Sequence, residues 1–227
     1  MILDYLLFFI GAYLLGSIPF AQLLAKTKGV NLLKSGSGNP GSSNVLASTK
    51  SLPLTAAVLV LDSTKGMVFV LLAKALAMPD YIAIWCGAFA VLGHAYSIFI
   101  GFKGGRGVLT AMGAILAFHL WSGLTLLIIV FAVFTPFLKN QPLGVFICYM
   151  LIPFFPIIFQ YQNQNFWLYL ALFFIVFISL GRRLFFVKRR SISEQVPNGE
   201  LFMNRLLFDR DIKDKKAWVA VSKSEDS

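Results

Sequence analysis

Residues 165–187 read NFWLYLALFFIVFISLGRRLFFV, and this apolar stretch decides the fold class. A helix needs about 20 residues to cross the roughly 30 Å of hydrocarbon in a bilayer, and this run is long enough. Basic residues at positions 182, 183 and 188–190 gather at its end, as is typical of the cytoplasmic side of a membrane span. We therefore expect a transmembrane helix here.

The same pattern recurs along the whole chain of 227 residues. Hydrophobic residues make up 58% of it, charged residues make up 13%, and the mean hydropathy is +0.76, more than a soluble core needs. Helices satisfy their own backbone hydrogen bonds in lipid, whereas an open sheet does not. The sequence therefore predicts an all-α, polytopic transmembrane helical bundle. The expected spans, about seven, are residues 3–25, 52–76, 81–100, 108–119, 120–138, 142–161 and 165–187.

The expected span at residues 108–119 is short and could cross only half of the bilayer. If it crosses, the loop cations fall almost entirely on one side, which the positive-inside rule assigns to the cytoplasm. Asp4 and Asp80 fall on the other side. We therefore expect the N-terminus outside and the C-terminus in the cytoplasm, in a multi-pass protein of the bacterial inner membrane. Counting residues 108–138 as one span would put the cations at 182–190 outside, against the rule.

Composition divides the chain into a transmembrane domain at residues 1–190 and a polar cytoplasmic tail at residues 191–227. The tail is too short for a core of its own, although residues 201–208 would suit an amphipathic turn on the membrane surface. Loop cations explain the net charge of +10, so no nucleic-acid partner is expected. Cys86 and Cys148 fall inside apolar runs, where cysteine mainly acts as a small hydrophobe. We therefore predict no disulfide framework, metal site or cofactor.

Between the first two expected spans, residues 35–44 read SGSGNPGSSN. Glycines allow a backbone to turn its N–H groups toward one concave site, and serine and asparagine side chains add further donors. This composition would suit an anion-binding cradle. The same residue types are also common in ordinary linkers, so the loop alone leaves both interpretations open.

The loop after the third expected span, residues 101–107, reads GFKGGRG and joins two cations to a flexible backbone. Cations together with backbone N–H groups at a helix start suit a phosphate ligand. The spacing is not that of a nucleotide-binding P-loop, which needs a glycine, four residues, and then Gly-Lys-Ser or Gly-Lys-Thr. The alternative is a simple positive-inside anchor, which would not need the glycines.

Ionisable residues inside the expected spans need an explanation, because lone charges are costly in lipid. Asp62 and Lys65 are three positions apart on one helical face and can pair, either to brace the bundle or to contact a ligand. His94 stands just before the GFKGGRG loop and could bond a substrate or hold that loop. No Asp or Glu lies close in sequence to His94 or His119, so nothing local supports a Ser-His-Asp triad.

Several motifs occur in the order of a known family. They are GSIPF at 16–20, GSGNPG at 36–41 with Asn44, Asp62 with Lys65 and Gly66, Gly93 with His94, FKGGRGV at 102–108, and Thr110. Together they resemble the bacterial acyl-phosphate:glycerol-3-phosphate acyltransferases, which are integral inner-membrane enzymes with seven spans. The close resemblance runs from residue 11 to residue 112, and a weaker similarity of span pattern continues to residue 187.

The resemblance implies transfer of a fatty acyl group from acyl phosphate to the primary hydroxyl of glycerol 3-phosphate, which forms lysophosphatidic acid for phospholipid synthesis. Its partners would be fatty acyl phosphate, glycerol 3-phosphate and membrane lipid, without a cofactor, at a site facing the cytoplasm. It identifies no protein partner. By the same resemblance, the residues carried over as catalytic are Ser37, His94 and Arg106, and those carried over as substrate-binding are Gly36, Gly38, Asn39, Asn44, Lys103, Gly104, Gly105 and Arg182.

The chain also departs from the family pattern. Arg106 stands where the family usually has lysine, and Ala47 stands where it has a phosphate-binding arginine. Residues 140–144 lack the family's serine, residues 179–190 lack its His and Asn, and residues 204–207 echo its C-terminal string at a displaced position. These departures keep open a catalytically inactive paralogue that binds a phosphorylated lipid or glycerol phosphate. A transporter of small anions would instead need a polar path across the bundle.

Overall fold

The computed structural model describes residues 2–129, 140–185, 191–214, 217–218 and 221. Within these residues the regular elements are all helical, which confirms the prediction of an all-α membrane protein. In chain order the α-helices are α1 (Ile2–Ser17), α2 (Phe20–Lys26), α3 (Ser42–Thr49), α4 (Leu52–Ala75), α5 (Asp80–Ala95), α6 (Val108–Phe118), α7 (Leu120–Leu127), α8 (Gln141–Leu151), α9 (Phe155–Ile158), α10 (Phe166–Phe185) and α11 (Asn198–Phe208). Short 3-10 turns, η1, η3 and η4, cover Ile98–Ile100, Ile152–Phe154 and Ser191–Gln195.

Several of these helices match the expected spans. The five stretches that are long and apolar enough to cross a bilayer are Ile2–Lys26, Leu52–Ala75, Asp80–Ile100, Gln141–Ile158 and Phe166–Phe185. Helix α6 has 11 residues and is about 16 Å long, roughly half of the hydrocarbon thickness. Helix α7 begins the expected span at 120–138, but residues 130–138 lie outside the described part of the chain. The count of seven spans and the sidedness of the termini therefore stay predictions.

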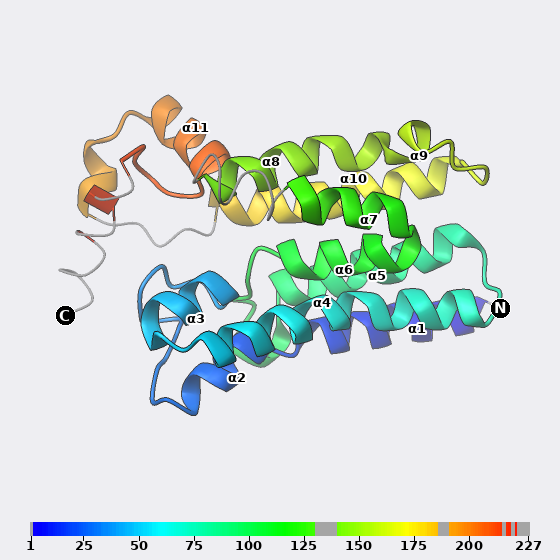
Figure 1. The fold of residues 1–227 in the computed structure, drawn as a ribbon, viewed down its shortest axis with the longest axis horizontal. Coiled ribbons are helices and arrows are strands. Elements are labelled where there is room, and N and C mark those ends of the chain that lie inside the picture. Colours follow the sequence, from blue (N-terminus) through cyan, green and yellow to red (C-terminus); the bar gives the residue numbers. More distant parts are fainter. Residues whose placement is uncertain (1, 130–139, 186–190, 215–216, 219–220, 222–227) are drawn as a thin grey trace.

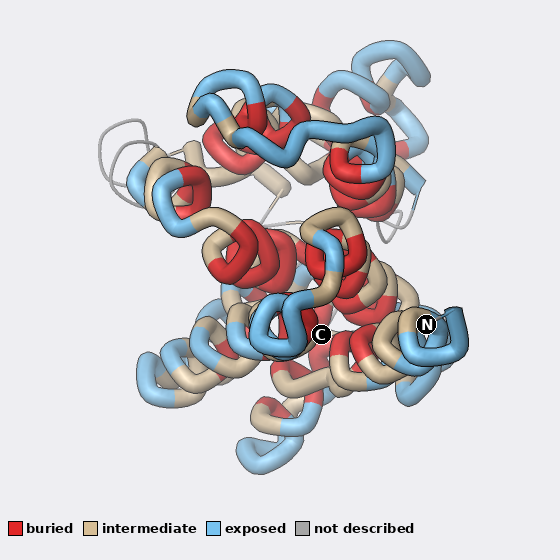
Figure 2. The backbone as a smooth tube through the Cα atoms, turned by 90° about the vertical axis from the view of Figure 1, so that its right-hand side faces the viewer, coloured by how far each residue is buried: buried red, intermediate tan, exposed pale blue. Residues whose placement is uncertain are grey.

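Helix α5 is the centre of the bundle and packs against α1, α4, α6 and α10. In an apolar 18-residue window of its candidate span, Asp80–Ile100, 67% is buried, against 28% in such a window of the peripheral Ile2–Lys26. Buried positions lie on the inner sides of the helices, and exposed positions lie on their outer sides and in the turns (Figure 2). Many outward side chains are large and apolar, such as Val60 and Phe177, as expected where lipid replaces water.

Close contact between α1 and α5 depends on glycine. A Cβ atom on Gly16 would lie 2.2 Å from the carbonyl oxygen of Ala90, and one on Gly93 would lie 2.1 Å from that of Tyr13. A side chain at either glycine would push the two helices apart. The glycines therefore allow the close approach of α1 and α5, as is common for helices in membranes. This contact places the end of α1 beside the end of α5, where His94 lies.

Helices α2, α3 and α11 gather at one end of the bundle, whereas α1 begins and α9 lies at the other end (Figure 1). Helix α11 belongs to the tail and packs against α8 and α10. Arg205 of α11 donates to the carbonyl of Leu184 at 2.9 Å, and Arg183 of α10 donates to that of Leu206 at 3.0 Å. Residues 201–208 thus form part of a helix that is tied to the end of α10. The expected domain boundary at 190 falls outside the described residues.

Candidate active site

The chain breaks between α1 and α2 at Pro19, which has no N–H to continue a helix. Two side chains from other parts of the bundle bind carbonyl oxygens at this break. Ser97 donates from Oγ to the carbonyl of Ser17 at 2.5 Å, and Lys65 donates from Nζ to that of Ile18 at 3.0 Å. The GSIPF motif is therefore a broken helix that is held by α4 and by the turn after α5.

Asp62 and Lys65 form the expected ion pair inside α4. Lys65 Nζ lies 2.8 Å from Asp62 Oδ1, and both side chains are only 2% exposed. His94 Nδ1 lies 3.8 Å from the same carboxylate oxygen, too far for a hydrogen bond but close enough for an electrostatic contact. The tertiary structure thus gives His94 an acidic neighbour that its sequence surroundings lack.

The GFKGGRG loop is wedged against the end of α5. The N–H group of Gly105 donates to the carbonyl of His94 at 3.0 Å. A Cβ atom on Gly104 would lie 1.9 Å from that carbonyl oxygen, and one on Gly105 would lie 2.2 Å from His94 Nε2. Glycine is therefore required here for close packing, and the loop is held through the backbone carbonyl of His94. Which of the two predicted roles the His94 side chain has stays a prediction.

This loop enters the bundle instead of staying at its surface. Gly104 and Gly105 of the loop line a pocket together with Asp62. Asp62 lies about 15 Å along α4 from the start of that helix at Leu52. Irregular backbone at such depth is tolerated where protein buries it, and Gly104 and Gly105 are buried. The 11 residues of α6 follow directly after this buried loop, which is consistent with the predicted short span at residues 108–119.

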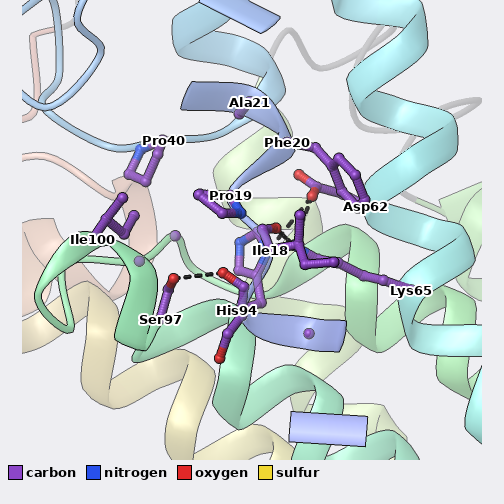
Figure 3. Close-up of a pocket in the computed structure, with 14 residues that line it drawn as sticks. Ile18, Pro19, Phe20, Ala21, Pro40, Asp62, Lys65, His94, Ser97 and Ile100 are labelled. Carbon is purple, nitrogen blue, oxygen red and sulfur yellow. Dashed lines mark hydrogen bonds and ion pairs between the residues drawn. The ribbon is translucent and has the colours of Figure 1, made fainter. Parts of the chain in front are cut away.

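A pocket lies where these parts meet (Figure 3). The residues that line it are Gly16, Ser17, Ile18, Pro19, Phe20, Ala21, Pro40, Asp62, Lys65, His94, Ser97, Ile100, Gly104 and Gly105. Pro40 comes from the first loop and the two adjacent glycines from the second, so both loops border one pocket. Ser37 and Lys103, also predicted for the site, are exposed and lie outside this lining.

Asn44 shapes the first loop from inside. Its Nδ2 group donates at 3.0–3.2 Å to three carbonyl oxygens, those of Leu32, Ser35 and Asn39. Its Oδ1 atom accepts from the N–H group of Ser37 at 3.2 Å, and the side chain is almost completely buried. Asn44 was expected to contact substrate, but its side-chain amide instead forms hydrogen bonds with the backbone of the loop.

The same loop turns sharply around Ser37. Gly36 and Gly38 adopt left-handed φ angles of 58° and 71°, which glycine adopts without strain. The hydroxyl of Ser37 accepts from the N–H group of Asn39 at 3.4 Å, and Asn39 is partly exposed. Ser37 is exposed in this turn, which connects α2 to α3 at the end of the bundle where these two helices and α11 lie (Figure 1).

Three arginines gather where the GFKGGRG loop meets α10 and the tail. Arg182 donates to the carbonyl of Gly104 at 2.6 Å, so it supports the loop. Arg106 forms an ion pair with Asp209, which directly follows α11. The same carboxylate lies 4.0 Å from Nε of the buried Arg183. The predicted cations Arg106 and Arg182 therefore border one positive region, and a carboxylate of the tail lies within it.

Sequence reasoning missed two of these contributors. Ser97 lies between the two halves of one motif without any distinguishing pattern around it. Asp209 follows residues 204–207, whose displaced echo of the family string was the only signal near it. Throughout the described ranges, no group of three or more His, Cys, Asp or Glu side chains could hold a metal ion.

Sequence comparisons identify relatives along most of the chain. A family model described as glycerol-3-phosphate acyltransferase matches residues 6–189. Glycerol-3-phosphate acyltransferase 5 of Dehalococcoides mccartyi is 34% identical, over 96% of this chain and 94% of its own length. A glycerol-3-phosphate acyltransferase of Geobacter metallireducens is 51% identical, over 47% of this chain and 54% of its own length.

Solved structures agree with this assignment. PlsY (YgiH), an integral membrane glycerol 3-phosphate acyltransferase, was crystallised in a glycerol 3-phosphate form that superposes with a TM-score of 0.71, at 31% identity, over 79% of this chain and 88% of that one. Its lysophosphatidic acid form gives a TM-score of 0.69 at 28% identity, over 96% and 98% of the two chains. The protein is therefore a multi-pass membrane protein, and the chain belongs to the glycerol-3-phosphate acyltransferase family.

Proposed function

We propose that this protein transfers a fatty acyl group from acyl phosphate to the primary hydroxyl of glycerol 3-phosphate. The product would be lysophosphatidic acid, made at the cytoplasmic face of the bacterial inner membrane. Two observations carry the proposal. The two glycine-containing loops border a single pocket, and Arg106 of the second loop lies close to Arg182 and Arg183 of α10. The glycerol 3-phosphate and lysophosphatidic acid forms of a related structure support it.

The chemistry fits a site of this composition. Both substrates carry phosphate dianions, which bind best to guanidinium groups and to backbone N–H donors. Acyl phosphate is a mixed anhydride with a good leaving group, so the protein mainly has to align the hydroxyl with the carbonyl carbon and stabilise the developing charge. A strong dedicated base is not required, and the acyl chain can stay among the outer apolar side chains of the bundle.

The proposed roles follow from where each residue lies. Arg106 neutralises a substrate phosphate, with the exposed Lys103 as a second cation at the loop surface. Ser37 offers a hydroxyl donor from the first loop. The N–H groups of Ser37, Gly38, Asn39 and Gly41 already donate within that loop, so its backbone does not form the expected anion cradle. His94 and Arg182 hold the second loop in place through its backbone. Asn39 lies beside Ser37 and adds an amide donor, while Asn44 acts by shaping the loop.

The test uses the full chain purified in detergent, given acyl phosphate and glycerol 3-phosphate, with release of inorganic phosphate as the measured quantity. We expect release to depend on both substrates and to fall strongly in Lys103→Ala and Arg106→Ala. Release that does not depend on glycerol 3-phosphate would refute acyl transfer. Binding of glycerol 3-phosphate without any turnover would instead support the inactive paralogue, which the departures at Ala47 and residues 140–144 keep open.

A further inference from the structure

Asp209 occupies an unusual position directly after α11. Its backbone is left-handed, with φ 58° and ψ 35°, a conformation that glycine usually supplies at the end of a helix. Asp and Asn tolerate this conformation better than other side chains do, but it still costs energy. Glycine would remove that cost, so the presence of Asp209 at this position suggests that its carboxylate has a role.

The tail holds this carboxylate firmly in place. Arg205 and Asp211 form a buried ion pair, with donor–acceptor distances of 2.6 and 3.2 Å, across the turn that contains Asp209. Arg205 also donates to the carbonyl of Leu184 in α10, and Asn204 donates to that of Asp211 at 3.1 Å. The turn after α11 is therefore fastened to the bundle, and its carboxylate is aimed at a fixed place.

That place is the cationic region beside the second loop. Asp209 pairs with Arg106 and lies 4.0 Å from Nε of Arg183. The side chains of Arg106 and Asp209 are 13% and 19% exposed, but the paired atoms, Arg106 Nε and Asp209 Oδ1, are buried. An anion from solvent can therefore approach the exposed parts of the pair and reaches Nε only by displacing the carboxylate. A phosphate carries more negative charge and more acceptor oxygens than one carboxylate does, so it can replace the carboxylate at Arg106.

We propose that Asp209 is an internal anion that occupies Arg106 until a substrate phosphate displaces it, and that it thereby sets the affinity of the site for phosphate. This inference rests on the proposed function, which assigns Arg106 to phosphate. Because the carboxylate competes for the same guanidinium, it weakens every anion that binds there. A dianion overcomes this competition more easily than a singly charged carboxylate ligand does, so Asp209 also favours phosphate over carboxylates.

The experiment measures equilibrium binding of glycerol 3-phosphate to the full chain in detergent. Asp209→Asn keeps the size and the tolerance of a left-handed backbone but removes the charge, and Asp209→Gly removes the charge and the strain. We expect the dissociation constant to fall about tenfold in both variants. Glu200→Gln is the matched control, because it removes an exposed carboxylate from the same helix, and it should bind like the wild type. An unchanged or higher dissociation constant in Asp209→Asn would overturn the inference.

A second measurement keeps the test decisive if a variant unfolds. In the wild type, glycerol 3-phosphate should increase amide hydrogen exchange around residues 205–211, because Asp209 then loses its partner. Slower exchange there on binding would contradict displacement. If the wild type turns over both substrates but Asp209→Asn binds no tighter, the inference fails and the proposed function survives. If the wild type neither binds nor consumes glycerol 3-phosphate, the proposed function fails, and the inference fails with it.

Discussion

Replacing Gly104 by alanine tests whether the depth of the GFKGGRG loop creates the site. The added Cβ atom would lie 1.9 Å from the carbonyl oxygen of His94, a backbone atom that cannot rotate away. Restoring an ordinary contact of about 3.5 Å requires the loop to move by roughly 1.5 Å. That shift breaks the hydrogen bond from Gly105 to His94 and also displaces the Gly104 carbonyl that Arg182 binds.

Two assays follow from this displacement. Overpacking of this kind costs about 1–3 kcal/mol, so thermal unfolding in detergent should start at a lower temperature. A misplacement of about 1 Å in a site that works by alignment can cost about a hundredfold in rate, so phosphate release should fall by at least about tenfold. Binding of glycerol 3-phosphate should weaken less than turnover does, because neutralising a phosphate charge depends less on exact alignment than the transfer step does.

Gly181→Ala is the matched control for this prediction. Gly181 lies within α10, and apart from the nearby backbone of its own helix and its two chain neighbours, no described atom lies within 4 Å of the place where its Cβ would be. Alanine favours helices over glycine by about 1 kcal/mol, so this variant should be as stable as the wild type or slightly more stable, with unchanged turnover. A Gly104→Ala protein with wild-type stability and wild-type turnover would refute the view that the loop is fixed by contact with α5.

Three further predictions concern the groups that hold the site. Lys65→Met should lower the free energy of unfolding by about 3–5 kcal/mol, because it leaves the buried Asp62 charge without its partner. Changing both Asp62 and Lys65 to apolar residues should recover part of this loss. Chemical denaturation in detergent measures the free energy of unfolding of both variants. Asn44→Ala should increase hydrogen exchange across residues 32–44 with α10 unaffected, because the loop loses its internal donors; equal protection would contradict the scaffold role. Arg205→Ala should make the segment around α11 sensitive to protease, since it leaves Asp211 buried and unpaired, whereas uniform resistance would show that the tail is held by other contacts.

Many residues of the candidate site could be identified from the sequence, but the residues that they contact could not. The two glycine-containing loops, His94 and Arg106 were all identifiable from motifs. Their partners were not, because Arg106 meets a carboxylate in the tail and His94 meets Asp62 from another helix. Asn44 shows the same limit: the motif marks it as important, and the structure assigns its hydrogen bonds to the loop.

The sequence by itself determined that the chain is an all-α membrane protein, that Asp62 and Lys65 pair, and where the two loops fall. These features are local, because a helix satisfies its own backbone within one apolar run and places residues three apart on one face. The tertiary structure alone decided that the second loop enters the bundle beside the break at Pro19, and that Asp209 reaches Arg106. Such contacts join segments far apart in the chain, and they depend on which helix faces meet, which no local pattern encodes.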